Sequence, residues 1–273
     1  SLCVALDGKT LRGTIRHDSL GTHLLALYVP STGVVLAQVE IGSKANEISA
    51  APQLLTALDL RGMVVTGDAM FAQRELSLAI LAAGGDYLWS VKDNQPHLKE
   101  AIETLFTPLP SAPGWGQPQT DFEVATSGPE KGHGRIETRR ITVSSALQDY
   151  LDWPGLSQVF MLETTSTNQV SGQSTTTVRY GATSLPHEIS DARSLLRQFR
   201  EYWGIESSLH YCRDVVFGED RCHTRMGEAA HLNATLNNTA ITLLRRLGHD
   251  GIAASRRRTA YIIGCSLAEA GYT

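Results

Sequence analysis

The sequence lacks the features that would place a protein in a membrane or in an oxidising compartment. No apolar run reaches the ~18 residues that a membrane helix needs, and no signal-peptide pattern opens the chain. It has only 4 cysteines in 273 residues, and their irregular spacing excludes a disulfide framework. We therefore predict a cytosolic protein with reduced thiols and no membrane contact, long enough to bury a large core.

A net positive charge is also missing, because the formal charge is −4. Lysine is scarce beside arginine, and arginines gather near the C-terminal end at Arg245, Arg246 and Arg256 to Arg258. A site that holds cations concentrates acids, so a negative total does not exclude a basic groove elsewhere. Composition alone leaves nucleic acid open as a partner.

Apolar runs and turn signals predict the order of elements in the first third of the chain. The expected strands are Leu2–Leu6, His23–Val29, Val34–Ile41, Met63–Thr66 and Tyr87–Val91, and the expected helices are Glu47–Leu60 and Gln73–Ala83. Three strands followed by helix, strand, helix and strand indicate a mixed sheet, with the fourth strand parallel to the first.

The pattern of apolar residues changes after a loop rich in Pro, Gly and Ser at 108–118. Strand-like stretches follow at Ile136–Val143, Val159–Thr165 and Thr175–Ala182, and helical periodicity returns from Asp191 to about Val216. We predict an α/β fold in three parts. These are the first part of an α/β core (1–107), a β-rich insertion outside the main sheet (108–183) and a helical remainder of the core (184–273).

Two acids stand at or just past the ends of apolar strands, Asp7 in Leu6-Asp7-Gly8 and Asp68 in Gly67-Asp68. If the two strands are parallel neighbours, both carboxylates meet at one edge of the sheet, where open α/β sheets bind ligands. Carboxylates that close repel each other unless a cation lies between them, and oxygen ligands suit Mg²⁺ or Mn²⁺. The competing interpretation is that either aspartate only caps a turn.

A third acid, Glu206, lies on the later predicted helix. At 100° per residue it shares a band with Tyr202, His210 and Arg213, and this band flanks an apolar stripe that contains Leu209. A helix that docks on the sheet through the stripe would aim Glu206 along the edge that carries the aspartates. The alternative is an ordinary surface network around a helical glutamate.

Six short blocks, in order, resemble those of insertion-sequence transposases of the H-repeat-associated family. They are Leu6-Asp7-Gly8-Lys9-Thr10-Leu11-Arg12-Gly13, Lys44-Ala45-Asn46-Glu47-Ile48, Thr66-Gly67-Asp68-Ala69, Val91-Lys92-Asp93-Asn94-Gln95, Gly132-His133-Gly134-Arg135-Ile136-Glu137 and Tyr202-Trp203-Gly204-Ile205-Glu206-Ser207-Ser208-Leu209-His210. The resemblance implies a ribonuclease H-like mixed sheet with flanking helices, interrupted by a β-rich insertion. It also implies a DDE enzyme in which Asp7, Asp68 and Glu206 hold two Mg²⁺ ions, with Mn²⁺ as a substitute.

The expected partners are transposon ends and target DNA, with a possible homodimer in the DNA complex and a bacterial cytoplasmic, nucleoid-associated setting. The residues expected to contact DNA are Lys9, Arg12, Lys92, Asn94, Arg135, His210 and Arg213. Family members usually carry a further N-terminal segment, whereas only six residues precede Asp7 here, so we expect sequence-specific end recognition to lie upstream.

Two alternatives stay open at this point. One is a DNA-binding remnant of a transposase that has lost activity. The other is a phosphatase like the haloacid dehalogenases, whose nucleophile block resembles Val4 to Thr10. Those phosphatases need a second acid two residues after the nucleophile, and that position is Lys9 here.

Overall fold

In the computed structural model of the chain, the described residues are 1–17, 21–42, 45–108, 120–132, 134–202, 209–224, 228–249 and 251–269. The chain divides into two compact units. One unit comprises Ser1–Cys3 and Ala51–Tyr202, and we call it the insertion unit because it contains the predicted insertion (108–183). The other, which we call the terminal unit, comprises Val4–Ala50 and Trp203–Thr273.

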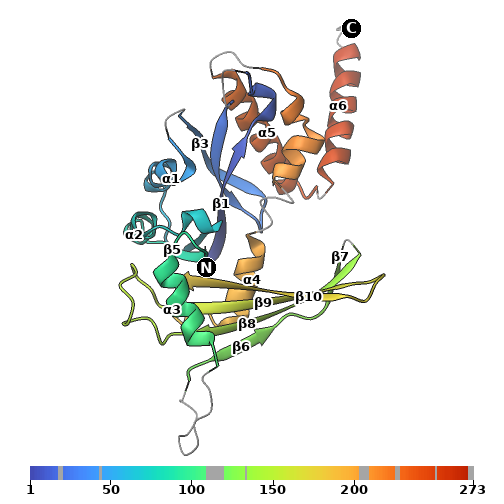
Figure 1. Ribbon diagram of the computed structural model, residues 1–273. Helices are drawn as coiled ribbons and strands as arrows, with labels where there is room; N and C mark the ends of the chain where they lie inside the picture. The colour runs from blue at the N-terminus through green and yellow to red at the C-terminus, as the bar shows by residue number, and fades with distance from the viewer. Residues whose placement is uncertain are drawn as a thin grey trace, which may run out of the picture. The chain divides into compact units, whose positions relative to one another are not determined.

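The insertion unit is built on one mixed sheet with the strand order β4-β5-β10-β9-β8-β6, while β7 pairs with β8 (Figure 1). Its strands are β4 (Met63–Gly67), β5 (Asp86–Val91), β6 (Glu123–Thr126), β7 (Glu130–Gly132), β8 (Arg135–Ser144), β9 (Gln158–Asn168) and β10 (Ser174–Thr183). β4 and β5 are parallel, and the other pairings are antiparallel. Its helices are η2 (Ala69–Phe71), α2 (Arg74–Ala82), α3 (Pro96–Phe106) and α4 (Ala192–Glu201).

The core of the insertion unit lies between α4 and the long strands. Leu195, Leu196 and Phe199 of α4 are buried against residues of β8 and β9 such as Ile141 and Phe160. The helix begins at Asp191, whose carboxylate accepts a hydrogen bond from the Ser194 backbone N–H and so satisfies one donor of the first turn. The amphipathic helix α4 thus packs on β8 and β9, and α3 also contacts β9 and β10.

Strands β6 to β10 occupy the segment expected to be rich in β-structure. The expectation that they lie outside the main sheet is wrong, because β10 pairs with β5 along Tyr180–Thr183. The pairing supplies partners for the backbone groups of β5, which would otherwise form a buried sheet edge. Gly181 permits the close packing here, since a Cβ at this position would lie 2.0 Å from Cζ of Phe160.

The terminal unit contains three antiparallel strands in the order β3-β2-β1. They are β1 (Leu2–Thr10), whose first two residues belong to the insertion unit, β2 (His23–Val29) and β3 (Val34–Ile41). The helices are η1 (Arg12–Thr14), α1 (Glu47–Thr56, which continues into the insertion unit), the π-helical η4 (Cys212–Val216), η5 (Glu219–Arg221), α5 (Ala229–Arg246) and α6 (Ile252–Glu269). α5 packs on β3.

The expected α/β class with flanking helices is confirmed, with a mixed sheet in the insertion unit and antiparallel strands in the terminal unit. Three antiparallel strands precede a parallel β-α-β pair, which is the order expected of a ribonuclease H-like sheet. In the described part of the chain, no helix combines the length and apolarity needed to span a bilayer.

Candidate active site

Asp7 lies inside β1 rather than at its end, so the expected position at a strand terminus is corrected. It is opposite Ala26, and the ladder continues to the pair Thr10–His23. β1 extends beyond its apolar run because β2 provides hydrogen-bond partners for the polar residues after Asp7. The Asp7 side chain is 20% exposed, and its Oδ2 lies 3.5 Å from Nδ1 of His210.

His210 is a mostly buried, neutral neighbour of Asp7. Burial lowers its pKa from 6.5 to about 3, and the positive charges of Arg213 and Lys9 act in the same direction. Its Nε2 is buried and finds no hydrogen-bond partner among the residues described. The segment that follows Glu206 in sequence therefore lies beside Asp7, the first aspartate of the predicted triad.

Lys9 is not available for the phosphate contact expected of it. Its side chain is 8% exposed, and its ammonium lies 2.6 Å from Oδ1 of Asp214 and 3.5 Å from Oδ1 of Asp220. Burying an ammonium without partners would cost several kcal/mol, so the two acids hold it in place. Lys9 therefore ties β1 to η4 and η5.

Arg12 remains accessible. Its side chain is 79% exposed, with Nε 3.7 Å from Oδ2 of Asp220, and its backbone N–H donates to the same carboxylate at 3.2 Å. An exposed, loosely paired guanidinium can exchange its carboxylate for a phosphate at little cost. Arg12 keeps its place among the expected DNA contacts.

Arg213 is buried completely, contrary to the expected phosphate contact. Its Nε donates to Oε2 of Glu219 at 2.7 Å, and its Nη1 donates to Oε1 of Gln38 at 3.4 Å. Asn237 donates to the second oxygen of Glu219, and Asn238 donates to Oε1 of Gln38. The network fastens η4 to β3 and α5, so Arg213 positions the segment that carries His210.

Asp68, in the insertion unit, directly follows β4 as expected. Its Oδ1 accepts the backbone N–H of Ala69 at 2.7 Å, which caps η2, and lies 3.3 Å from Nζ of Lys92. Both side chains are open to solvent, Asp68 at 54% and Lys92 at 59%. Asp68 therefore caps η2 and also offers an exposed carboxylate.

Asn94 supports the turn after Asp68, although the residue is exposed to solvent. Its Nδ2 donates to the carbonyl of Ala69 at 2.7 Å, while Nε2 of Gln95 donates to the carbonyl of Ala72 at 2.9 Å. These amides hold η2 from the loop that follows β5. Asn94 thus has a positioning role, and its expected DNA contact stays a prediction.

The remaining residues expected at the site lie at the surface or outside the described residues. Arg135 is exposed at the start of β8, and Arg246, Arg257 and Arg258 are exposed near the C-terminal end. Glu206 lies outside the described residues, and Asp7 and Asp68 belong to different units. The convergence of the three carboxylates stays a prediction.

Sequence reasoning missed the acids that neutralise the buried cations, which are Asp214, Glu219 and Asp220. Glu219 follows Arg213 by six residues, outside the i,i+3 and i,i+4 spacings that mark helical pairs. No local pattern marks such a pairing.

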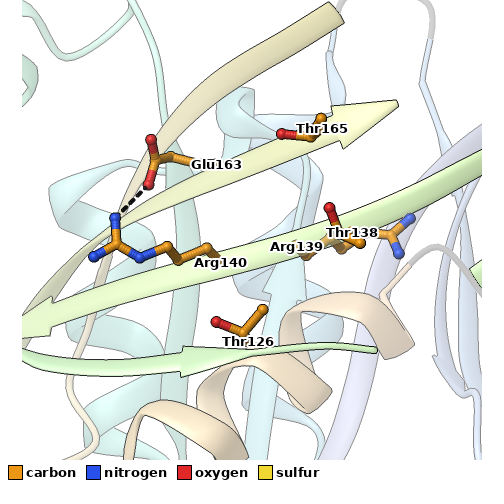
Figure 2. Close-up of a pocket in the computed structure, with 6 residues that line it drawn as sticks. All are labelled: Thr126, Thr138, Arg139, Arg140, Glu163 and Thr165. Atoms are coloured by element: carbon orange, nitrogen blue, oxygen red, sulfur yellow. Dashed lines mark hydrogen bonds and ion pairs between the residues drawn. The ribbon is translucent and has the colours of Figure 1, made fainter. Parts of the chain in front are cut away.

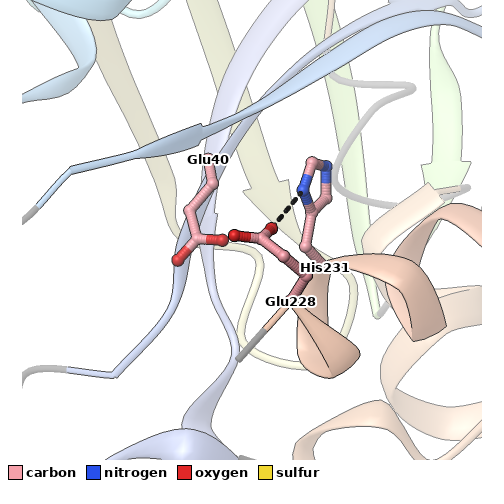
Figure 3. A group of neighbouring side chains, drawn as sticks. All are labelled: Glu40, Glu228 and His231. Atoms are coloured by element: carbon pink, nitrogen blue, oxygen red, sulfur yellow. Dashed lines mark ion pairs between the residues drawn. The ribbon is translucent and has the colours of Figure 1, made fainter. Parts of the chain in front are cut away.

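A second group of potential metal ligands was not expected from the sequence. One ligand atom each of Glu40, Glu228 and His231 lies within 4.8 Å of the others (Figure 3). Both carboxylates are exposed, and Nδ1 of His231 is 3.7 Å from Oε2 of Glu228. Exposed acids commonly gather in this way without an ion, and we assign the group no role.

A polar pocket of about 290 Å³ lies on the sheet of the insertion unit. Figure 2 shows Arg140 and Glu163 turned toward each other across it, with a nitrogen–oxygen distance of 3.0 Å. The other lining residues are Thr126, Thr138, Arg139 and Thr165. It contains none of the expected site residues.

Comparison with known proteins gives a family match over most of the chain. Residues 1–243 match the family described as "Transposase DDE domain". The chain is 32% identical over 249 residues to "H repeat-associated putative transposase YhhI" of Escherichia coli K12, an alignment that covers 88% of this chain and 63% of that protein. "Putative transposase YncI" of Escherichia coli O157:H7 is also 32% identical over 249 residues, with 89% and 61% coverage. The chain thus spans about three-fifths of the length of these relatives.

Among solved structures, a chain of "Cryo-EM structure of piggyBac transposase synaptic complex with hairpin DNA (SNHP)" aligns with a TM-score of 0.47 and 11% identity. It covers 94% of this chain and 48% of that one.

Proposed function

Since the chain belongs to the transposase DDE domain family, we propose that it cleaves DNA and transfers the cut strand, with Asp7, Asp68 and Glu206 as its catalytic acids. The observation that carries the proposal is the 3.5 Å approach of His210 to Asp7. His210 follows Glu206 by four residues, about one turn of the helix expected from the sequence. An arrangement that brings His210 to Asp7 supports a meeting of Glu206 with the same carboxylate.

The donor set fits divalent cations. Asp7 and Asp68 offer carboxylate oxygens that remain partly exposed, and oxygen donors are what Mg²⁺ prefers, with Mn²⁺ as a substitute. Asp68 already attracts the Lys92 ammonium, so a cation is favourable beside it. When bound, two Mg²⁺ ions would supply Lewis acidity at the scissile phosphate and the attacking oxygen.

The chain's own residues then have separate tasks. Asp7, Asp68 and Glu206 would hold the ions, and Lys92 and the Ala69 backbone N–H orient Asp68. His210 stays neutral beside Asp7 and adds no charge that would compete with a cation. Arg12, Lys92 and Arg135 are the exposed cations that would contact phosphate.

The substrates proposed are transposon ends and target DNA in the bacterial cytoplasm, with the chain at the nucleoid. A homodimer in the DNA complex would let each copy act on one end. These assignments rest on family membership and on exposed cations in both units.

A plasmid-nicking assay in Mg²⁺ and in Mn²⁺ tests the proposal through Asp68→Asn. The amide keeps the shape of the side chain and removes its charge, so cleavage should be lost while DNA affinity changes less than about two-fold. Asp59→Asn is the matched control, because Asp59 is an exposed aspartate of the same unit that pairs with Arg61.

Undiminished cleavage by Asp68→Asn would refute the assignment of this acid. A wild-type protein that binds DNA but cuts in neither metal would identify the inactive remnant instead.

A further inference from the structure

The solvent-facing side of α5 is unusual for a surface helix. Its buried side is formed by Ala230, Ala234, Asn238 and Ile241. On the opposite side, four leucines are exposed by 55% to 73%, and we call them the leucine stripe: Leu232, Leu236, Leu243 and Leu247. A surface helix normally turns charged residues to solvent.

Charge is almost absent from this side. The exposed positions between the leucines are Thr235, Thr239 and Arg246, so Arg246 is the one charged residue among them. At 1.5 Å per residue the stripe is about 22 Å long. Single exposed leucines are ordinary, but a continuous apolar patch of roughly several hundred Å² marks an interaction site.

The order of the residues points to the kind of partner. Leu236 precedes Thr239 by three residues and Leu243 follows Ala240 by three, while Leu232 and Leu247 lie seven residues away on the same two sides. The stripe is therefore symmetric about the bond between Thr239 and Ala240. A two-fold axis through that point would make the stripe complementary to itself.

We infer that the leucine stripe of α5 is the surface through which two copies of this chain associate, with their α5 helices antiparallel. Leu236 then packs on the partner's Leu243, and Leu232 packs on the partner's Leu247. The small side chains of Thr239 and Ala240 at the crossing allow the two axes to approach closely. DNA does not fit this surface, because a single cation cannot bind a phosphate backbone over about 22 Å.

This inference deepens the homodimer of the proposed function but does not depend on DNA or on cleavage. One helix pair buries less than the ~1,200 Å² of a stable interface, so we expect a dissociation constant on the order of 10 µM. The dimer should therefore form without DNA and dissociate on dilution.

The test is sedimentation equilibrium of the 273-residue chain without DNA, from about 1 to 200 µM. The wild type should pass from monomer to dimer, and Leu236→Glu/Leu243→Glu should stay monomeric, because each Glu would face a Glu of the partner. Leu236→Lys/Leu243→Glu should dimerise again, since each Lys would then face a Glu across the two-fold axis. Leu78→Glu, at an equally exposed leucine of the insertion unit, should behave as the wild type.

Circular dichroism should show that each variant is folded, because the substituted positions are exposed. A wild type that is monomeric at every concentration would overturn the inference, as would a dimer that survives the two glutamates. Failure of the Lys/Glu variant to dimerise would overturn the antiparallel register and with it the proposal. Cleavage assays are not used, so this result and the fate of the proposed function are independent.

Discussion

Replacing Arg213 by methionine separates a positioning role from a DNA-contacting one. The guanidinium is completely buried and bonded to Glu219, whose side chain is only 1% exposed. Arg213→Met keeps much of the volume but leaves the Glu219 carboxylate buried without its cation. Breaking a buried pair in this way costs about 3–5 kcal/mol, a large part of the ~5–15 kcal/mol that stabilises a typical domain.

Urea unfolding followed by circular dichroism measures this loss. Adding Glu219→Gln to Arg213→Met should recover most of it, because the second change removes the unpaired charge while the amide oxygen can still accept from Asn237.

Arg12→Met is the matched control, and it should affect DNA binding rather than stability. Arg12 is 79% exposed, so its loss should cost less than about 1 kcal/mol, yet it should lower the salt dependence of DNA binding by about one phosphate contact. Arg213→Met should leave that salt slope unchanged under conditions where the protein remains folded. An Arg213→Met protein of normal stability with a reduced salt slope would show that Arg213 faces DNA.

Three further predictions concern packing, pH and binding. Gly181→Ala should lower the free energy of unfolding by about 3 kcal/mol, because its Cβ would lie 2.0 Å from Cζ of Phe160 and 2.5 Å from the Trp89 carbonyl. Gly42→Ala, with nothing within 4 Å, is the control in urea unfolding, and equal stability of the two variants would disprove the packing argument. The pKa of His210 is about 3 in the folded chain and 6.5 as the ordinary value, so unfolding takes up a proton between these values and stability falls as pH falls through this window. His210→Gln should therefore lose about 2 kcal/mol less than the wild type between pH 7.5 and pH 5, and identical losses would contradict a neutral buried ring. Fluorescence anisotropy should show DNA affinity that falls steeply with salt and is equal for an end sequence and a scrambled duplex, whereas a tight, salt-insensitive preference would place end recognition in this chain.

The sequence predicted most strands within one to three residues because their apolar runs are bounded by clear turn signals. His23–Val29 and Val34–Ile41 have the bounds that were expected. The strand predicted at Leu2–Leu6 was too short. The polar residues after Asp7 pair with β2 through backbone groups, which hydropathy does not report. The expected helix Glu47–Leu60 ends at Thr56.

What the sequence did not indicate depends on contacts between distant segments. The pairing of β10 with β5 is a choice between sheet edges, and alternation within a strand carries no information about its neighbour. For the same reason Lys9 and Arg213 were expected at a DNA surface. Burial by partners more than a hundred residues away decided their environment.

The terminal unit joins the two ends of the chain, and this has a consequence for synthesis on the ribosome. Lys9 meets Asp214, and Gln38 meets Asn238 across 200 residues. At about 5–20 residues per second, β1 to β3 wait on the order of 10–40 s for the helices that cover them. Throughout that interval their apolar faces need protection, while the insertion unit has most of its sequence available to fold. We therefore expect nascent chains that stop before α5 to engage chaperones or aggregate.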